Sequence, residues 1–242
     1  MIELAVVSAF ADNYIYLGGN PATRECFVVD PGDGAPALAE AERRGWRVTS
    51  VLNTHWHGDH TGGNAAVRAA TDAPVTGPAA EAAKIRALDH PVREGDRVTA
   101  AGFEARVLDI PGHTAGHIAF VFDELQIAFV GDTIFAAGCG RLLEGTADQM
   151  WHSLTKLMAL PDSTLLACAH EYTLANLAFA EHVEPGSPAV AAAIADAKAA
   201  RAQGVPTVPT TVAAERTVNP FVRAGSAAEF ARRRAAKDAF RG

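Results

Sequence analysis

The sequence is poor in cysteine, and its few cysteines form no recognisable pattern. Cys26, Cys139 and Cys168 are an odd number, lie far apart and include no CxxC pair. This spacing excludes a disulfide framework and favours a reducing compartment. We expect each of the three to be a small, buried apolar side chain.

The chain also lacks a long apolar run and a basic leader. Its N-terminal stretch has no basic segment of the signal-peptide kind, and Asp12 and Asn13 interrupt the apolar residues there. No stretch approaches the ~20 apolar residues that a membrane-spanning helix requires. We therefore expect a soluble, cytoplasmic protein with no membrane partner.

Positive charge is in the minority. The 21 Lys and Arg residues face 28 Asp and Glu residues, for a formal net charge of −7. A nucleic-acid partner requires a large basic surface, so we expect none, although a local basic pocket is compatible with this charge. The 242 residues, 49% hydrophobic and 20% charged, are typical of a globular protein with a sizeable core. Nothing requires a dimer, and we expect a monomer that acts on a small molecule.

Short strands dominate the first two thirds of the chain, and helices the last third. Apolar runs bounded by Gly, Pro and Asp predict strands at Ile2–Val7, Tyr14–Leu17, Cys26–Asp30, Val48–Asn53, Arg97–Ala100, Phe103–Ile110, Ile118–Phe122, Gln126–Val130 and Thr164–Ala169. Helical spacing predicts helices at Pro36–Arg44, Gly63–Ala70, Met150–Met158, Tyr172–His182, Pro188–Gln203 and Ser226–Phe240, the last two joined by a Pro-rich stretch, Val205–Pro220. We expect an α/β domain at residues 1–170 and a small helical domain at residues 171–242.

One segment concentrates metal-ligand side chains directly after a predicted strand. His55 and His57 lie two residues apart in an extended chain, so both side chains can reach one ion. Gly58 permits a sharp turn, after which Asp59 and His60 can face a second ion. Imidazole and carboxylate ligands suit Zn²⁺ and also iron or manganese.

Three later predicted strands each deliver one further ligand-type residue just past their ends. These residues are His113, Asp132 and His170. A single histidine after a strand is often incidental, so the interpretation depends mainly on the HxHxDH run. Five imidazoles and two carboxylates are enough for two metal ions with a bridging carboxylate and a bridging water. Of the other histidines, His90, His117, His152 and His182, we expect His117 to matter most, because it closely follows His113.

The HxHxDH run, followed by single His, Asp and His residues after later strands, resembles the metallo-β-lactamase superfamily. The resemblance covers residues 1–170 and implies an αβ/βα four-layer sandwich with the metals at one edge of two facing sheets. It does not identify the substrate, because members of the superfamily catalyse many reactions.

Other segments resemble the glyoxalase II family, the hydroxyacylglutathione hydrolases, over the whole chain. They are CGRLLEGT at 139–146, AHEYT at 169–173, HVEPG at 182–186, PTVP at 206–209, NPF at 219–221 and RAAKD at 234–238. The resemblance implies a first metal site of His55, His57 and His113 and a second of Asp59, His60 and His170, with Asp132 bridging. It also implies that Arg141, Tyr172, Arg234 and Lys237 bind glutathione. The chain has Leu143 at a substrate-loop position where several members carry an aromatic residue, so a contact to glutathione can be missing there.

The implied reaction is the second step of methylglyoxal detoxification, in which S-D-lactoylglutathione, an S-2-hydroxyacylglutathione, is cleaved to D-lactate and glutathione. Two divalent ions, which we expect to be Zn²⁺ with iron or manganese as alternatives, would lower the pKa of a bound water from 15.7 to about 7, so that a bridging hydroxide can attack the thioester carbonyl. The catalytic residues would be His55, His57, Asp59 and Asp132, with Asp59 both ligating a metal and orienting the hydroxide. A thiolate leaving group, with a pKa near 8.5, needs no strong acid.

Alternatives stay open at this point. A glutathione persulfide dioxygenase shares this fold but uses a single iron, and oxygen consumption with glutathione persulfide would reveal it. A β-lactamase is less compatible with the lack of an export signal, and a nuclease with the net charge. A non-catalytic metal- or glutathione-binding module would bind metal without hydrolysing any thioester.

Overall fold

The computed structural model describes residues 2–241, which form two compact units. Among the described residues, the first unit comprises residues 2–109 and 115–131, and the second comprises residues 110–114 and 132–241. This division differs from the boundary after residue 170 that the change in secondary structure predicts, and that domain boundary stays a prediction. No helix in the described part of the chain is long and apolar enough to cross a membrane.

The first unit begins with a mixed sheet whose strands follow chain order. These strands are β1 (Glu3–Ala9), β2 (Asn13–Gly19), β3 (Glu25–Val29), β4 (Arg47–Leu52), β5 (Val75–Pro78) and β6 (Leu88–Val92). β1, β2 and β3 pair antiparallel, whereas β3 to β6 pair parallel. Parallel neighbours need crossover connections, which α1 (Gly34–Arg44), α2 (Gly58–Thr61) and α3 (Asn64–Thr71) provide, followed by the 3₁₀ turn η1 (Ala79–Glu81).

A second, antiparallel set of strands completes this unit. It contains β7 (Arg97–Ala100), β8 (Phe103–Asp109), β9 (Ile118–Phe122), the 3₁₀ turn η2 (Asp123–Leu125) and β10 (Ile127–Gly131), with the strands in the order β10-β9-β8-β7. Every residue of β9 and β10 is buried, as expected of strands covered on both faces.

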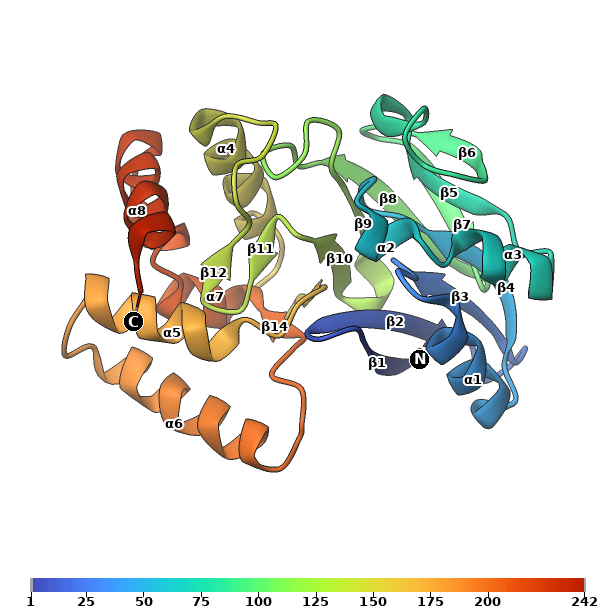
Figure 1. The fold of residues 1–242 in the computed structure, drawn as a ribbon, viewed down its shortest axis with the longest axis horizontal. Helices are drawn as coiled ribbons and strands as arrows, with labels where there is room; N and C mark the ends of the chain where they lie inside the picture. The colour runs from blue at the N-terminus through green and yellow to red at the C-terminus, as the bar shows by residue number, and fades with distance from the viewer. Residues whose placement is uncertain (1, 242) are drawn as a thin grey trace. The chain divides into compact units, whose positions relative to one another are not determined.

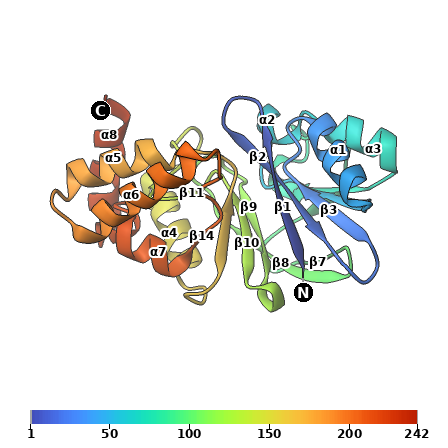
Figure 2. The same cartoon turned by 90° about the horizontal axis from the view of Figure 1, so that it is seen from below.

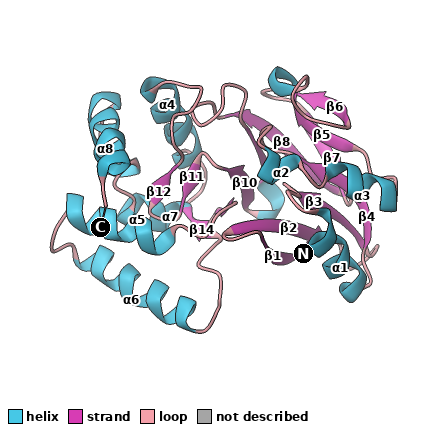
Figure 3. Cartoon of the chain, in the orientation of Figure 1, coloured by secondary structure: helices cyan, strands magenta, loops and turns pink. Residues whose placement is uncertain are grey.

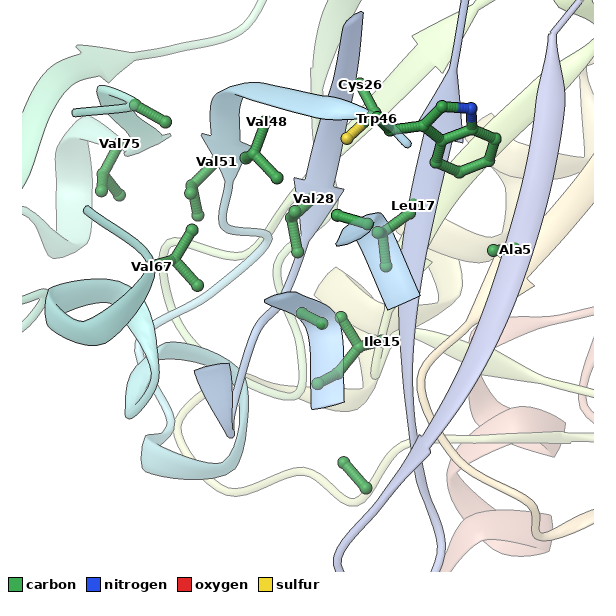
Figure 4. Packing of buried hydrophobic residues seen from close by; sticks show 14 residues of the cluster. Ala5, Ile15, Leu17, Cys26, Val28, Trp46, Val48, Val51, Val67 and Val75 are labelled. Carbon is green, nitrogen blue, oxygen red and sulfur yellow. The ribbon is translucent and has the colours of Figure 1, made fainter. Parts of the chain in front are cut away.

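The core of the first unit has an aliphatic layer and an aromatic layer. Leu17, Val28 and Val51 of the mixed sheet belong to one buried cluster with Val67 of α3 (Figure 4). Helices α1 and α3 lie on one side of β3 (Figure 2). On the opposite face, Phe27 of β3 stacks on Phe122 of β9 with ring centroids 5.0 Å apart. Burying a side chain of this size stabilises the fold by about 1.5–3 kcal/mol. The layers therefore run from helices to mixed sheet to antiparallel sheet.

The second unit is mainly helical (Figures 1 and 3). It contains the short β11 (Ile134–Phe135) and β12 (Gly138–Cys139) hairpin, α4 (Ala147–Met158), and the antiparallel pair β13 (Leu165–Cys168) and β14 (Thr210–Thr211). The remaining helices are α5 (Thr173–Val183), α6 (Pro188–Ala202), α7 (Val212–Val218), η3 (Val222–Ala224) and α8 (Ala227–Ala239). α4 begins with a capping box, in which Thr146 and Gln149 exchange side-chain-to-backbone hydrogen bonds.

Two strands are missed and one connection is misinterpreted from the sequence alone. β5 and β6 were not predicted, because Val75–Pro78 contains Gly and Pro and Leu88–Val92 shows no apolar alternation. The stretch Val205–Pro220, interpreted as a Pro-rich connection, contains β14 and α7. Thr211 caps α7 by accepting a hydrogen bond from the Ala214 N–H, a signal that the neighbouring prolines obscured.

Candidate functional site

The four ligand-type residues of the HxHxDH run lie together in the first unit. His55 and His57 lie in the connection from β4 to α2, and Asp59 and His60 lie in α2 itself. His55 Nε2 lies 3.0 Å from His57 Nδ1, and the ring centroids of His55 and His60 lie 4.0 Å apart. Asp59 Oδ2 lies 3.5 Å from His60 Nε2. Gly32 permits this arrangement, because a Cβ there would lie 1.8 Å from the Asp59 carbonyl oxygen.

A buried carboxylate that the sequence did not single out orients part of this turn. Asp30 follows β3, accepts hydrogen bonds from Thr54 N–H at 2.8 Å and Thr54 Oγ1 at 2.7 Å, and lies 3.1 Å from His60 Nδ1. Asp30, His55 and His60 each offer a ligand atom within 4.8 Å of the others. With the Nδ1 proton directed at Asp30, His60 Nε2 carries the lone pair that a metal needs, a common carboxylate–histidine arrangement.

Two more residues, which the sequence did not connect with the site, hold the same segment. Glu81, which is buried, accepts hydrogen bonds from the backbone N–H of Trp56 and of Gly116, each at 2.9 Å. Trp56 lies between His55 and His57, so this carboxylate anchors the chain between two ligand-type residues. Asn13 Nδ2 donates to Asp59 Oδ2 at 2.9 Å and thereby restricts the Asp59 side chain.

His117 stands apart from the other three additional histidines. It is fully buried and stacks on His55 with ring centroids 4.5 Å apart, whereas His90, His152 and His182 are exposed. This contact allows His117 to support the His55 ring.

The second unit brings together His113, Asp132 and His170. Asp132 Oδ2 lies 3.5 Å from His113 Nε2 and 3.3 Å from His170 Nε2, so the carboxylate lies between the two rings. His113 Nδ1 lies 3.0 Å from the Arg141 carbonyl oxygen, which leaves Nε2 as its lone-pair nitrogen. Gly112 permits the turn before His113, because its φ is 151° and a Cβ would lie 2.7 Å from Met150 Cβ.

These donor sets fit divalent metal ions. With metal–ligand bonds of about 2.1 Å, neighbouring ligand atoms around a tetrahedral ion lie about 3.4 Å apart. The three separations of 3.3–3.5 Å around Asp59 and Asp132 match this spacing. Imidazole nitrogen and carboxylate oxygen are ligands that zinc, iron and manganese all accept.

A cavity of about 580 Å³ lies within the second unit and has both ligand-type and cationic residues in its lining. His113 and Asp132 line it, and so do the four residues expected to bind glutathione, Arg141, Tyr172, Arg234 and Lys237. Leu143 is 57% exposed and is not among the described residues that line this cavity. Asn176 and Arg241 line it too, but no sequence pattern had indicated them.

The cationic side chains of the cavity are held in place. Arg234 is buried, donates to the Cys139 carbonyl oxygen at 2.9 Å and to Asp238 Oδ1 at 2.8 Å, and lies over the Phe221 ring. Lys237 Nζ donates to the Ala175 carbonyl oxygen at 2.7 Å, and burial, with the Arg234 charge nearby, lowers the pKa of Lys237. These side chains form a positive region on an acidic protein.

Two uncharged side chains, Tyr172 and Cys139, also line the cavity. Tyr172 stacks on His170 with ring centroids 4.8 Å apart. Burial raises the pKa of the Cys139 thiol to about 11, so this cysteine is a neutral packing residue at neutral pH, as the sequence predicted.

Comparison with known proteins defines the class first. Residues 12–170 match the family model of the metallo-β-lactamase superfamily. The crystal structure of ETHE1 from Myxococcus xanthus superposes with a TM-score of 0.74 at 27% identity, over 97% of this chain and 90% of that one. The crystal structure of TTHA1623 in a di-iron-bound form superposes with a TM-score of 0.63 at 26% identity, over 89% of this chain and 98% of that one. The fold is therefore the α/β metallo-β-lactamase fold that the motif implied, with a helical C-terminal region.

The remaining residues and the curated relatives define the family within this class. Residues 171–240 match the model of the hydroxyacylglutathione hydrolase C-terminus. The hydroxyacylglutathione hydrolase of Rhodospirillum rubrum is 49% identical to this chain, over 93% of this chain and 88% of that protein. The chain belongs to the hydroxyacylglutathione hydrolase family, also called glyoxalase II.

Proposed function

We propose that this protein hydrolyses S-2-hydroxyacylglutathione thioesters, and S-D-lactoylglutathione in particular, to a 2-hydroxy acid and glutathione. This reaction is the second step of methylglyoxal detoxification. The observation that carries the proposal is the cavity of the second unit, which His113 and Asp132 line together with Arg141, Arg234 and Lys237. Glutathione has two carboxylates, and guanidinium groups bind carboxylates in bidentate geometry.

The seven proposed metal ligands are the four ligand-type residues of the HxHxDH run together with His113, Asp132 and His170. His55, His57 and His113 would hold one ion, Asp59, His60 and His170 the other, and Asp132 both. When bound, two divalent ions supply an acidified water as nucleophile and polarise the thioester carbonyl. Zinc is the proposed metal, although the same ligands accept iron or manganese, and the similar TTHA1623 binds two irons.

The protein's own side chains position the reactants. Asp59, held by Asn13, would ligate a metal and orient the attacking oxygen toward the carbonyl carbon. Arg141, Tyr172, Arg234 and Lys237 would hold glutathione, with the three cationic side chains meeting its carboxylates and Tyr172 stacked on His170. The glutathione thiolate has a pKa near 8.5 and leaves without a general acid.

The proposed function is tested by following the loss of S-D-lactoylglutathione and, in parallel, oxygen consumption with glutathione persulfide. Thioester hydrolysis without oxygen uptake supports the proposal. Oxygen uptake without hydrolysis would instead identify a persulfide dioxygenase. Metal binding with neither reaction would indicate a non-catalytic module.

Three further expectations remain predictions. The protein is proposed to be cytoplasmic, to act as a monomer, and to bind neither nucleic acid nor membranes. Elution of the purified chain at the mass of one copy would support the second.

A further inference from the structure

The β11–β12 hairpin connects two predicted site residues of the second unit. Asp132 precedes β11 by two residues, and Arg141 follows β12 by two. Each strand has only two residues, with Ile134 paired to Cys139 and Phe135 to Gly138. Its turn includes Ala137 at a φ of 56°, a left-handed conformation that is unfavourable for a residue other than glycine. A hairpin this short has little stability of its own, so other parts of the unit must hold it.

Four side chains hold four consecutive residues of this hairpin. Asn176 of α5 donates to the Ala136 carbonyl oxygen at 3.1 Å, and Glu215 of α7 accepts from the Ala137 N–H at 2.9 Å. Asn219 donates to the Gly138 carbonyl oxygen at 2.9 Å, and Arg234 of α8 donates to the Cys139 carbonyl oxygen at 2.9 Å. All four side chains are buried. The hairpin lies among these helices in Figure 1.

Two of the four, Glu215 and Asn219, form one connected network. Asn219 Nδ2 donates to Glu215 Oε2 at 2.7 Å, and Thr210 Oγ1 donates to Glu215 Oε1 at 2.7 Å. Asn219 Oδ1 accepts from the Phe221 N–H at 2.9 Å. A buried carboxylate and a buried amide are costly unless every polar atom is satisfied, as it is here. Apolar side chains could fill the same space at a lower cost, which suggests that the network serves to fix the hairpin backbone.

The two remaining side chains reach the cavity directly. Asn176 and Arg234 line it, whereas Glu215 and Asn219 do not. Glu215 and Asn219 therefore act on substrate binding only through the groups they hold, which are the hairpin backbone and, for Asn219, the N–H of Phe221, whose ring lies against Arg234.

We propose that Glu215 and Asn219 are positioning residues for glutathione binding, because they fix the hairpin that sets Arg141 relative to Arg234. This inference rests on the proposed function. Arg234 takes part on both sides, since the guanidinium expected to meet a glutathione carboxylate also holds the Cys139 carbonyl. If the hairpin loosens at Ala137 and Gly138, the spacing of the cationic groups changes, and glutathione binding weakens before the chemistry does.

The test compares Glu215→Ala with Glu215→Gln. Glutamine can retain all three contacts if its carbonyl oxygen faces Ala137 and Asn219 and its amide donates to Thr210 Oγ1. The matched control is Val212→Ala on the same helix, which removes a fully buried aliphatic side chain without touching the hairpin hydrogen bonds. KM and kcat for S-D-lactoylglutathione, the Kd for reduced glutathione, metal content and Tm are measured on each protein as purified.

We expect Glu215→Ala to raise KM and the glutathione Kd about tenfold, with kcat changed less than threefold and metal content unchanged. Glu215→Gln should stay within twofold of the parent, and Val212→Ala should lower Tm without raising KM. If Glu215→Ala does not fold, Thr210→Val removes only the outer hydrogen bond of the network and should raise KM about twofold to threefold.

Distinct outcomes separate the failure of the inference from that of the function. Unchanged KM and Kd in the Glu215→Ala or Thr210→Val protein, or an equal rise in Val212→Ala, would reduce the network to a structural role. A parent protein that neither hydrolyses the thioester nor binds glutathione would overturn the proposed function, and this inference with it.

Discussion

Glu215 makes the stability of the protein depend on pH in a way that can be calculated. Burial raises the pKa of Glu215 from 4.5 to about 7, although hydrogen bonds from Thr210, Asn219 and the Ala137 N–H oppose the rise. The other titratable group coupled to it is the Cys168 thiol, whose pKa is raised to about 12 by burial, so it stays neutral throughout. Glu215 is therefore the group in this network that changes charge near neutral pH.

The sign follows from the raised pKa. The folded state binds the Glu215 proton more tightly than the unfolded chain, so this contribution to stability is full below pH 4.5 and is lost as the pH rises through 7. A shift of about 2.5 pKa units corresponds to roughly 3 kcal/mol in total, of which roughly 2 kcal/mol is lost between pH 5.5 and pH 8. Glu215→Gln removes the titration and keeps the shape.

The assay is urea unfolding of the parent and of Glu215→Gln at pH 5.5, 6.5, 7.5 and 8, with equal metal content. Because both proteins share every other titrating group, their difference in free energy of unfolding isolates Glu215. As the pH rises from 5.5 to 8, we expect the free energy of unfolding of the parent to fall by roughly 2 kcal/mol relative to that of the variant. A difference that does not change with pH would refute the reasoning, because Glu215 would then have the same pKa folded and unfolded.

Other perturbations address the site more directly. Asp59→Ala should lower kcat by about a hundredfold or more with the fold retained, because Asp59 orients the nucleophile and a small misplacement of a reacting group can cost about 10²-fold. Near-normal turnover with two metals would contradict this role. Replacing Arg234 and Lys237 with Ala should raise KM for glutathione thioesters more than it lowers kcat, and a double variant with the parent's KM would place the binding pocket elsewhere. Glu81→Ala leaves the N–H groups of Trp56 and Gly116 without their acceptor. It should therefore lower the free energy of unfolding by about 1–3 kcal/mol and weaken metal retention. A variant as stable and as metal-rich as the parent would argue against the anchoring role.

Much of the fold could be predicted because its strands are short apolar runs with clear ends. Arg97–Ala100 and Ile118–Phe122 match β7 and β9 residue for residue, since a turn signal bounds each. Val75–Pro78 could not be predicted, because a four-residue strand containing Gly and Pro is defined by its neighbours β4 and β6 rather than by its own composition. The seven residues of α7 were hidden for a similar reason, since the helix depends on packing of Val212 and Glu215 more than on periodicity.

In the candidate site, too, some residues could be predicted from the sequence and others could not. The HxHxDH run and the single residues at strand ends could be selected from the sequence, because residue type and spacing indicate metal-ligand chemistry. The supporting residues could not. Asp30, Glu81 and Asn13 act on backbone or side-chain atoms 24 to 46 positions away, and such pairs have no signal in a single sequence. In the sequence Glu81 looks like an ordinary charged residue of a short turn. Its anchoring role is evident only from the two backbone N–H groups that donate to it.

The most direct test of the account is to measure turnover of S-D-lactoylglutathione and metal content on the same sample while the metals are removed with a chelator and then restored. We predict that turnover falls with metal content, disappears in the metal-free protein, and returns as two ions per chain are bound. Full turnover by the metal-free protein, or no turnover by protein with two ions bound, would contradict the assignment of this chain as a binuclear glutathione thioester hydrolase.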